Sequence, residues 1–187
     1  MSFLDETTDL RDAFFMGVYD IISHNKDALI LTADHGAFWL NKIAKDFPDR
    51  YLNVGIAEQN MISFAAGLAS CGKKVYAYSI NNFVTMRALE QLNLDVCANN
   101  FDVNIIGVGA GFTYCTDGPS HHGVQDLAAV FNLPNLTIYN VTDSKSSYDI
   151  AKTSIAPGPK YYRIEKGIAP VVYDDCFDKS AGLGKFY

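Results

Sequence analysis

The residue with the clearest chemical potential is Glu58, the acid in "NVGIAEQNM" (residues 53–61). It stands among small and apolar residues, directly ahead of the helical pattern "MISFAAGLASCG". Acids are common in the first turn of a helix, because the free N–H groups there stabilise negative charge by roughly 0.3–1 kcal/mol. A carboxyl group in a dry pocket also holds a proton more readily than in water, and can exchange it with a bound group. From these residues alone, both interpretations stay open.

A long glycine-rich loop, "GVGAGFTYCTDGPSHHG" (residues 107–123), is the second candidate. Loops longer than about 12–15 residues in a compact domain are usually functional or disordered. This loop carries two aromatic residues, Asp117, His121 and His122, which favours function. Its glycines weakly resemble a dinucleotide fingerprint, but no amphipathic helix opens at the third glycine.

Other catalytic chemistries have weaker support. The chain has no GxSxG motif, and Cys115, six residues before His121, is the only arguable thiol–histidine arrangement. Without an HxxxH or CxxC partner for the histidines, we expect no metal site built by this chain alone. Phe83 and Arg163 have ordinary explanations as a core aromatic and a strand-end ion-pair partner.

The elements that must position these residues alternate along the chain. Continuous apolar runs predict buried strands, and apolar residues at helical spacing predict the helices between them. The expected strands are Ala28–Ala33, Tyr51–Val54, Lys74–Ser79, Val103–Val108, Leu136–Val141 and Lys160–Ile164. The expected helices are 7–25 with Thr8 as its cap, 38–44, 57–71 with Gly72 as its stop, 83–97, 124–131 and 144–155. This order predicts an α/β fold, a mostly parallel sheet of about six strands with helices on both faces.

Ligands of such sheets gather at the carboxyl ends of the strands. Asp34 follows the first expected strand and Glu58 the second. Residues 79–83 follow the third strand, the glycine-rich loop follows the fourth, and Arg163 lies on the last. We therefore expect one site at this edge of the sheet.

Composition narrows the class of protein. The chain has 187 residues, 49% hydrophobic and 19% charged, with a formal net charge of −6 and no basic block. Nucleic acid and anionic membranes are therefore not expected as partners, and no apolar run approaches the roughly 20 residues that span a bilayer. The acidic N-terminus lacks a signal core, and four scattered cysteines without CxxC spacing fit a reducing cytoplasm. We expect one domain over residues 1–170, followed by a linker over 171–187 that leads to an absent C-terminal domain.

Two long segments resemble one known family. Phe47–Ser79, which contains "VGIAEQ", closely resembles the glutamate block of the pyrimidine-binding domain of the transketolase family. Asp117–Val130, "DGPSHHGVQDLAAV", resembles the family's "DGPTHQ" loop and the helix after it. The resemblance extends from Ala28 to Gly167 and implies a thiamine diphosphate-binding fold.

The resemblance implies cofactor-binding roles for four residues. Glu58 would hydrogen-bond the N1′ nitrogen of the aminopyrimidine of thiamine diphosphate and share a proton with it, which makes Glu58 catalytic. Phe83 would pack on the pyrimidine face, and Ile80 stands where the family often has a second phenylalanine. Asp34, in "TADHG", matches an acid close to the cofactor.

The resemblance also implies substrate-binding residues. Asp117 and His121 would contact the hydroxyls and carbonyl of the donor sugar, with His121 also catalytic, and Arg163 would bind the sugar phosphate. The family's additional histidine earlier in this loop is replaced around Phe112–Tyr114. The choice of substrate therefore stays open.

A partner is implied as well. The family holds Mg²⁺ and the diphosphate with a GDG motif and a downstream Asn on a separate domain, and this sequence has no GDG. We expect a split subunit or a truncated chain that works with a GDG-bearing chain or domain, in at least a dimer.

Three activities and one non-catalytic role remain possible. The chain could belong to an enzyme that transfers a two-carbon ketol unit between sugar phosphates, or to one similar to 1-deoxy-D-xylulose-5-phosphate synthase. It could also be a non-catalytic assembly module of this fold. An oxo-acid dehydrogenase beta-type subunit shares the pyrimidine grip but usually lacks the "DGPTHQ"-like loop.

Overall fold

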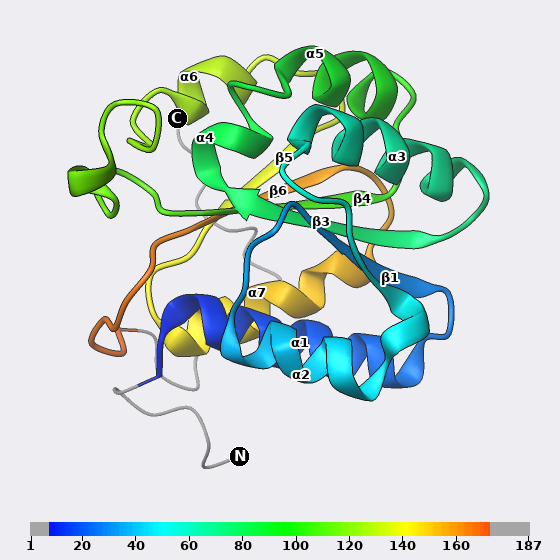
Figure 1. Ribbon diagram of the computed structural model, residues 1–187, viewed down its shortest axis with the longest axis horizontal. Helices are drawn as coiled ribbons and strands as arrows, with labels where there is room; N and C mark the ends of the chain where they lie inside the picture. The colour runs from blue at the N-terminus through cyan, green and yellow to red at the C-terminus, as the bar shows by residue number, and fades with distance from the viewer. Residues whose placement is uncertain (1–7, 173–187) are drawn as a thin grey trace.

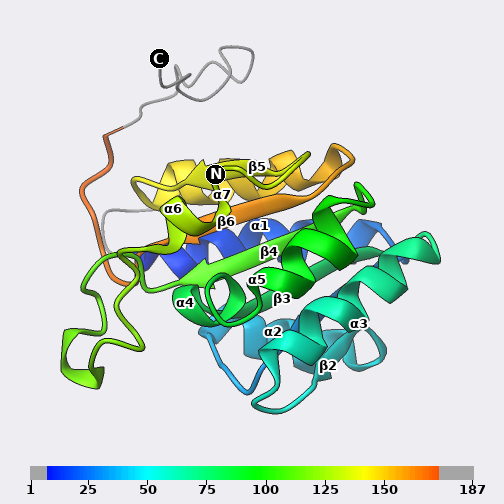
Figure 2. The same cartoon turned by 90° about the horizontal axis from the view of Figure 1, so that it is seen from above.

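A six-stranded, all-parallel sheet forms the centre of the molecule, in a computed structural model that describes residues 8–172. The strand order is β2-β1-β3-β4-β6-β5, and Figure 2 shows the sheet from β2 at one edge to β5 at the other. The strands are β1 (Ala28–Thr32), β2 (Tyr51–Asn53), β3 (Lys74–Ile80), β4 (Val103–Val108), β5 (Thr137–Asn140) and β6 (Lys160–Ile164). The predicted α/β fold with a parallel sheet is therefore confirmed.

Helices cover both faces of the sheet (Figure 1). One face carries α1 (Leu10–His24), α2 (Phe38–Asp46) and α7 (Ser144–Lys152). The other carries α3 (Glu58–Ser70), α4 (Asn81–Val84), α5 (Leu89–Gln91), the π-helix η2 (Leu92–Cys97) and α6 (Asp126–Val130). Single 3₁₀ turns are η1 (Pro48–Arg50), η3 (Cys115–Asp117) and η4 (Thr153–Ile155).

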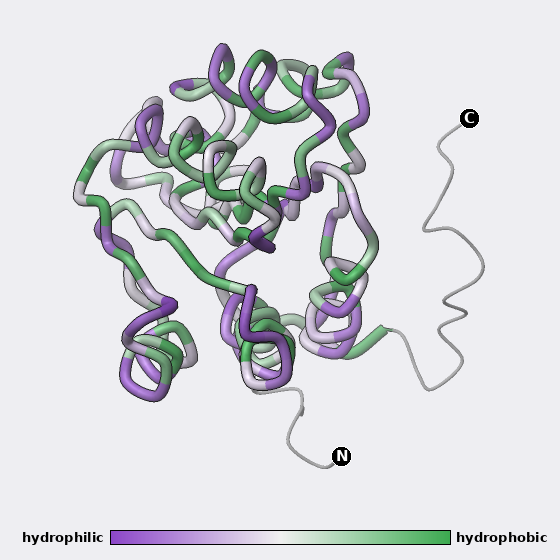
Figure 3. Tube along the Cα trace, turned by 90° about the vertical axis from the view of Figure 1, so that its right-hand side faces the viewer, coloured by the Kyte–Doolittle hydropathy of each residue, from purple (hydrophilic) through white to green (hydrophobic). Residues whose placement is uncertain are grey.

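Alternation along the central strands builds a separate core on each face. Tyr76 and Tyr78 of β3 belong to the cluster under α1, α2 and α7, whereas Val75 and Ala77 belong to the cluster under α3 and η2. Successive strand residues point to opposite faces, which is why one strand serves both cores. Figure 3 shows the helices of the α1 face nearly end-on, with the sheet between the two helical layers.

The beginning of α1 differs from the prediction. Its cap is Asp9 rather than Thr8, because the Asp9 carboxylate accepts hydrogen bonds from the backbone N–H groups of Arg11 and Asp12. The same carboxylate accepts from the N–H of Gly167, which joins the two ends of the described chain. Asp9 therefore caps the helix and also fixes where the chain leaves the last strand.

The helix predicted over residues 83–97 is broken. The α-helical turn α4 ends at Val84, and helical structure resumes at Leu89 before widening into the π-helix. Asn81 and Asn82 are buried, and their amides bond to the Asp126 carboxylate and to the carbonyl of His122. These long-range bonds fix the first turn against the glycine-rich loop, so apolar spacing alone overestimated the helix.

The end of the expected domain is only partly described. Residues 171 and 172 are described without regular structure, and the rest of the predicted linker, with Cys176, lies outside the described residues. Within residues 8–172, no helix has the length and apolarity needed to cross a membrane.

Candidate active site

Glu58 is a buried acid at the carboxyl edge of the sheet. It is the first residue of α3, and its side chain is 2% exposed. One carboxylate oxygen accepts a long, 3.4 Å hydrogen bond from the Ser79 hydroxyl at the end of β3. The other oxygen accepts a 2.9 Å bond from Nη1 of Arg87. Glu58 therefore shows both features considered from the sequence, because it opens a helix and is also buried.

Arg87 joins Glu58 to the aromatic ring predicted for the site. Its guanidinium carbon lies 3.8 Å from the centroid of the Phe83 ring while Nη1 holds the Glu58 carboxylate. Phe83 is 8% exposed, and the Arg87 guanidinium shields part of its ring from solvent. Arg87 itself is 41% exposed. We call these three residues, Glu58, Phe83 and Arg87, the acid–aromatic cluster. Its cation, Arg87, is accessible to water.

The glycine-rich loop folds back onto this cluster. Gly111 and Gly123 exchange two backbone hydrogen bonds of 2.8 Å at the base of the loop. The Asn82 amide bonds to the carbonyls of Ser120 and His122. The ring of His121 then meets the Phe83 ring edge-on, with centroids 4.9 Å apart. Two predicted residues from distant parts of the chain are therefore in contact.

Gly123 must be glycine because the backbone approaches it closely. A Cβ at this position would lie 2.6 Å from the carbonyl oxygen of Gly109, closer than packed atoms allow. Gly109 has φ +90° and lies under the Tyr114 ring, where an added Cβ would overlap that ring. These glycines close the loop onto the ends of β4 and β6.

Arg163 is held by the protein on three sides. Its Nε donates to the Asp126 carboxylate at 2.8 Å, Nη1 to the Asn140 side chain and Nη2 to the carbonyl of Gly123. The arginine is 17% exposed and its carboxylate partner 1%. A guanidinium has five N–H donors, so about two remain for a ligand.

Asp126 gathers further donors on the oxygen that holds Arg163. Oδ2 accepts from the Asn81 amide at 3.0 Å and from the Tyr161 hydroxyl at 2.9 Å. Burial, and then the nearby Asp126 charge, raise the pKa of Tyr161 well above its usual value, so this hydroxyl stays a donor. We call Asp126 and Arg163 the braced pair. Together with their hydrogen-bond partners, these two residues connect α4, α6, β5, β6 and the loop.

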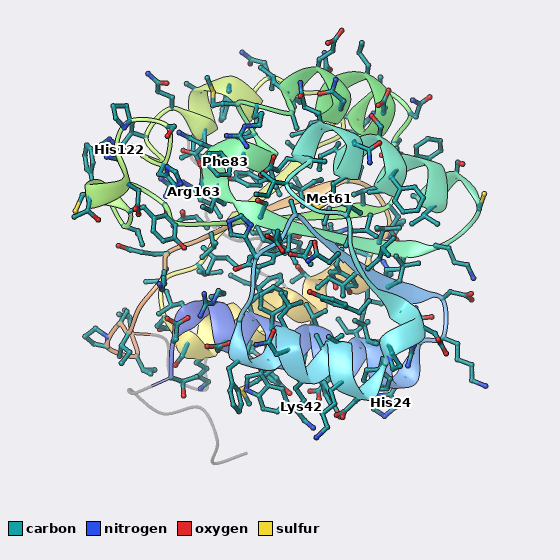
Figure 4. The ribbon with its side chains drawn as sticks, viewed as in Figure 1. His24, Lys42, Met61, Phe83, His122 and Arg163 are labelled. Atoms are coloured by element: carbon teal, nitrogen blue, oxygen red, sulfur yellow. The ribbon has the colours of Figure 1, made fainter. Side chains whose placement is uncertain are left out.

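The remaining predicted residues surround this edge. Ile80 is buried at the end of β3 in the same cluster as Phe83. Asp34 is exposed, has φ +59°, and its carboxylate accepts from the Asn53 amide at 2.9 Å. Asp117 is exposed in η3. Figure 4 shows Phe83, Arg163 and His122 on one side of the molecule, while His24 and Lys42 lie below on the other helical layer.

Two residues of this edge were missed from the sequence. Arg87 lies four residues after Phe83, a spacing that brings side chains together on a helix and was the available signal. Asp126 appeared only as part of a motif, and no local feature signalled its burial. Among residues 8–172, no group of three His, Cys, Asp or Glu side chains could hold a metal ion.

Comparison with known proteins gives the family. The family model "Transketolase, pyrimidine binding domain" matches residues 6–170. One of the subunits of the apulose-4-phosphate transketolase of Phocaeicola vulgatus is 31% identical over 167 residues, covering 88% of this chain and 54% of that protein. A 1-deoxy-D-xylulose-5-phosphate synthase of Syntrophus aciditrophicus is 37% identical over 147 residues, 78% of this chain and 22% of the synthase.

A solved structure agrees with these relatives. "Split gene transketolase, inactive beta4 tetramer" has a TM-score of 0.79 and 30% sequence identity, and covers 90% of this chain and 55% of that one. The chain thus spans about half the length of the Phocaeicola vulgatus relative and of this solved chain. On these matches, the chain belongs to the transketolase family and comprises its pyrimidine-binding domain.

Proposed function

We propose that this chain is the pyrimidine-binding part of a thiamine diphosphate-dependent, transketolase-like enzyme that moves a two-carbon ketol unit between sugar phosphates. The observation that carries the proposal is the Glu58 carboxylate, 2% exposed at the carboxyl edge of the sheet and held by a partly exposed arginine. A buried acid whose main partner can withdraw is suited to a ligand that brings its own hydrogen bond.

The residues of the acid–aromatic cluster fit an aminopyrimidine. Glu58 supplies a carboxyl group for a ring nitrogen, and Phe83 supplies a face on which a ring can pack, worth about 0.5–1.5 kcal/mol beyond burial. Ile80 adds apolar surface at the end of β3. Thiamine diphosphate, when bound, supplies the stabilised carbanion of the reaction. Glu58 would share a proton with the ring nitrogen through this hydrogen bond.

We assign the donor sugar to the glycine-rich loop. His121 would contact the donor beside the ring site and act on its carbonyl, and its contact with Phe83 supports this proposal. Asp117 lies on the same loop and is open to a sugar hydroxyl. Arg163 would bind the phosphate through the N–H groups left free by the braced pair, as suits a planar cation. Asp34 stays a proposed cofactor contact.

The diphosphate and Mg²⁺ would be bound by a partner chain or domain with the GDG motif. A relative named as one part of a transketolase of several subunits supports a divided enzyme, and "Split gene transketolase" supports an oligomer of at least two chains. The location we propose, the cytoplasm, rests on the composition and the spacing of the cysteines.

A second candidate is the synthase reaction that joins pyruvate to a triose phosphate. The 37% identity to a 1-deoxy-D-xylulose-5-phosphate synthase favours it. Supplying the assembled complex with each substrate pair in turn and identifying the product by mass spectrometry separates the two activities.

The test of the proposal is Glu58→Gln in the complex assembled with the partner recovered by pull-down from the native source. Because proton transfer by a positioned side chain contributes about 10²–10⁴-fold, turnover is expected to fall by at least about 100-fold. The matched control is Asp49→Asn, an exposed acid in η1, which should leave turnover within about twofold. Turnover unchanged in Glu58→Gln would contradict the proposed function.

A further inference from the structure

Arg87 makes both contacts that the proposed cofactor ring requires. Its guanidinium lies 3.8 Å from the Phe83 ring centroid and 2.9 Å from a Glu58 oxygen. Resting on the proposed function, we propose that Arg87 occupies the place of the aminopyrimidine in the free chain. The arginine must then swing out before thiamine diphosphate binds, which makes it a built-in competitor of the cofactor.

The geometry leaves little room for both groups. A ring that packs on Phe83 while bonding to Glu58 must lie between these two side chains. Phe83 is only 8% exposed, and the centroid of the His121 ring already lies 4.9 Å from that of the Phe83 ring. The Phe83 ring therefore has no second open face on which another group could stack. The cofactor ring and the Arg87 guanidinium need the same space.

The chemistry of the two groups matches. A guanidinium is flat, delocalised and rich in N–H donors, and it stacks on aromatic faces while it binds carboxylates. An aminopyrimidine is also flat, and it would bond to the carboxyl group through a ring nitrogen. Arg87 thus satisfies a buried carboxylate that would otherwise be short of partners in the absence of the ring.

The Arg87 side chain also has an alternative position available to it. With 41% of its side chain exposed, it can leave Glu58 without being drawn through the core. It lines a surface hollow of about 490 Å³ together with Gln59, Met86 and Glu90. The Glu90 carboxylate, three residues along the chain, offers a new partner for the displaced cation on the same hollow.

Competition of this kind lowers the apparent affinity for the cofactor by the fraction of chains whose site is open. In the closed state, Arg87 contacts Glu58 and Phe83. The partly exposed ion pair and the cation–π contact together favour this state over the open one about fivefold to thirtyfold. Removing Arg87 should therefore strengthen cofactor binding, the opposite of what removing a cofactor contact does.

The experiment compares thiamine diphosphate binding, in the presence of Mg²⁺, by wild-type, Arg87→Ala and Arg50→Ala complexes, using isothermal titration calorimetry. Arg50 is the matched control, because its guanidinium lies 4.4 Å over the Phe47 ring and away from the site. We expect Arg87→Ala to bind about fivefold to thirtyfold more tightly than wild type, with Arg50→Ala unchanged.

Affinity equal to or weaker than wild type in Arg87→Ala would overturn the inference and leave the proposed function standing. Failure of both wild type and Arg87→Ala to bind thiamine diphosphate would overturn the proposed function, and the inference with it.

A second readout uses the free chain labelled with ¹⁵N-arginine. The Arg87 side-chain NMR signal, assigned by its loss in Arg87→Ala, should shift toward that of free arginine in Glu58→Gln. An Arg87 signal that does not move would show that the contact is absent, and the inference would fail.

Discussion

Two arginine–carboxylate pairs lie at the same edge of the sheet, and they differ in how firmly each cation is held. In the braced pair, Arg163 has three acceptors and is 17% exposed, and Asp126 collects donors from α4 and β6. In the acid–aromatic cluster, Arg87 has one carboxylate and one ring, and is 41% exposed. Both acids are buried, so the difference lies with the cations.

We infer from this difference that the braced pair is structural and that the Arg87–Glu58 pair is exchangeable. Breaking a buried, multiply bonded pair leaves several polar groups unsatisfied at once, so the braced pair stays closed and fixes the glycine-rich loop. An ion pair whose cation is accessible to water contributes little net stability, so a ligand can replace the cation. The sequence prediction gave Arg163 a ligand role and missed Arg87. The structure gives Arg163 a structural role as well, and places Arg87 at the buried acid.

The largest effect expected is on the braced pair. Asp126→Ala removes the common acceptor of Arg163, Asn81 and Tyr161. We expect the free energy of unfolding to fall by about 3–5 kcal/mol, measured by urea denaturation. Asp117→Ala, which changes an exposed acid on the glycine-rich loop, should change it by less than about 0.5 kcal/mol. A loss below about 1 kcal/mol in Asp126→Ala would show that the pair does not brace the fold.

The comparison is tested directly by removing each cation in turn. Arg163→Ala leaves the Asp126 carboxylate, which is 1% exposed, without its cation. This change should lower the free energy of unfolding by about 2–4 kcal/mol. Arg87→Ala lets water approach Glu58, and should cost about 1–2 kcal/mol of unfolding free energy. Equal losses in the two variants, in the same urea titration, would remove the distinction between scaffold and site.

A third test acts on the backbone that Arg163 holds. Gly123→Ala places a Cβ against the Gly109 carbonyl and should cost about 1–3 kcal/mol, with displacement of the loop. Gly67→Ala is the control, because this glycine lies in α3 with open space around it. The control should stabilise the chain by up to about 1 kcal/mol. A Gly123→Ala chain as stable as wild type would mean that the close approach is not needed.

The smallest expected effect concerns salt. Raising the ionic strength from about 0.1 to about 1 M shortens the screening length from about 10 to about 3 Å. The stability difference between wild type and Arg87→Ala should therefore shrink, by a few tenths of a kcal/mol, whereas the cost of Arg163→Ala should change little. Equal salt dependence in the two denaturation series would argue that the two cations have the same exposure to solvent.

The sequence predicted the sheet well because its signals are local. Short apolar runs such as Val103–Val108 define buried strands without reference to the rest of the chain, and their order implies parallel pairing. The edge that carries Glu58, Phe83 and His121 follows from that topology. The role assigned to each of these residues came from the family resemblance and remains a proposal.

The parts that were missed depend on long-range polar contacts. The break after Val84 arises where buried Asn81 and Asn82 bond to partners about 40 residues away, and apolar spacing does not contain that information. The same holds for Asp126, whose donors come from α4 and β6. Arg87 was within reach of a helical spacing rule, but whether an arginine meets solvent or a buried acid depends on the folded chain.

The most direct measurement of the central claim is a crystal structure of the chain with the proposed diphosphate-binding partner, thiamine diphosphate and Mg²⁺. We predict the aminopyrimidine between Phe83 and Glu58, with N1′ within hydrogen-bonding distance of the Glu58 carboxyl group and Arg87 turned away. Arg163 should still hold Asp126. An aminopyrimidine bound elsewhere, with Arg87 still on Glu58, would contradict this assignment of the site.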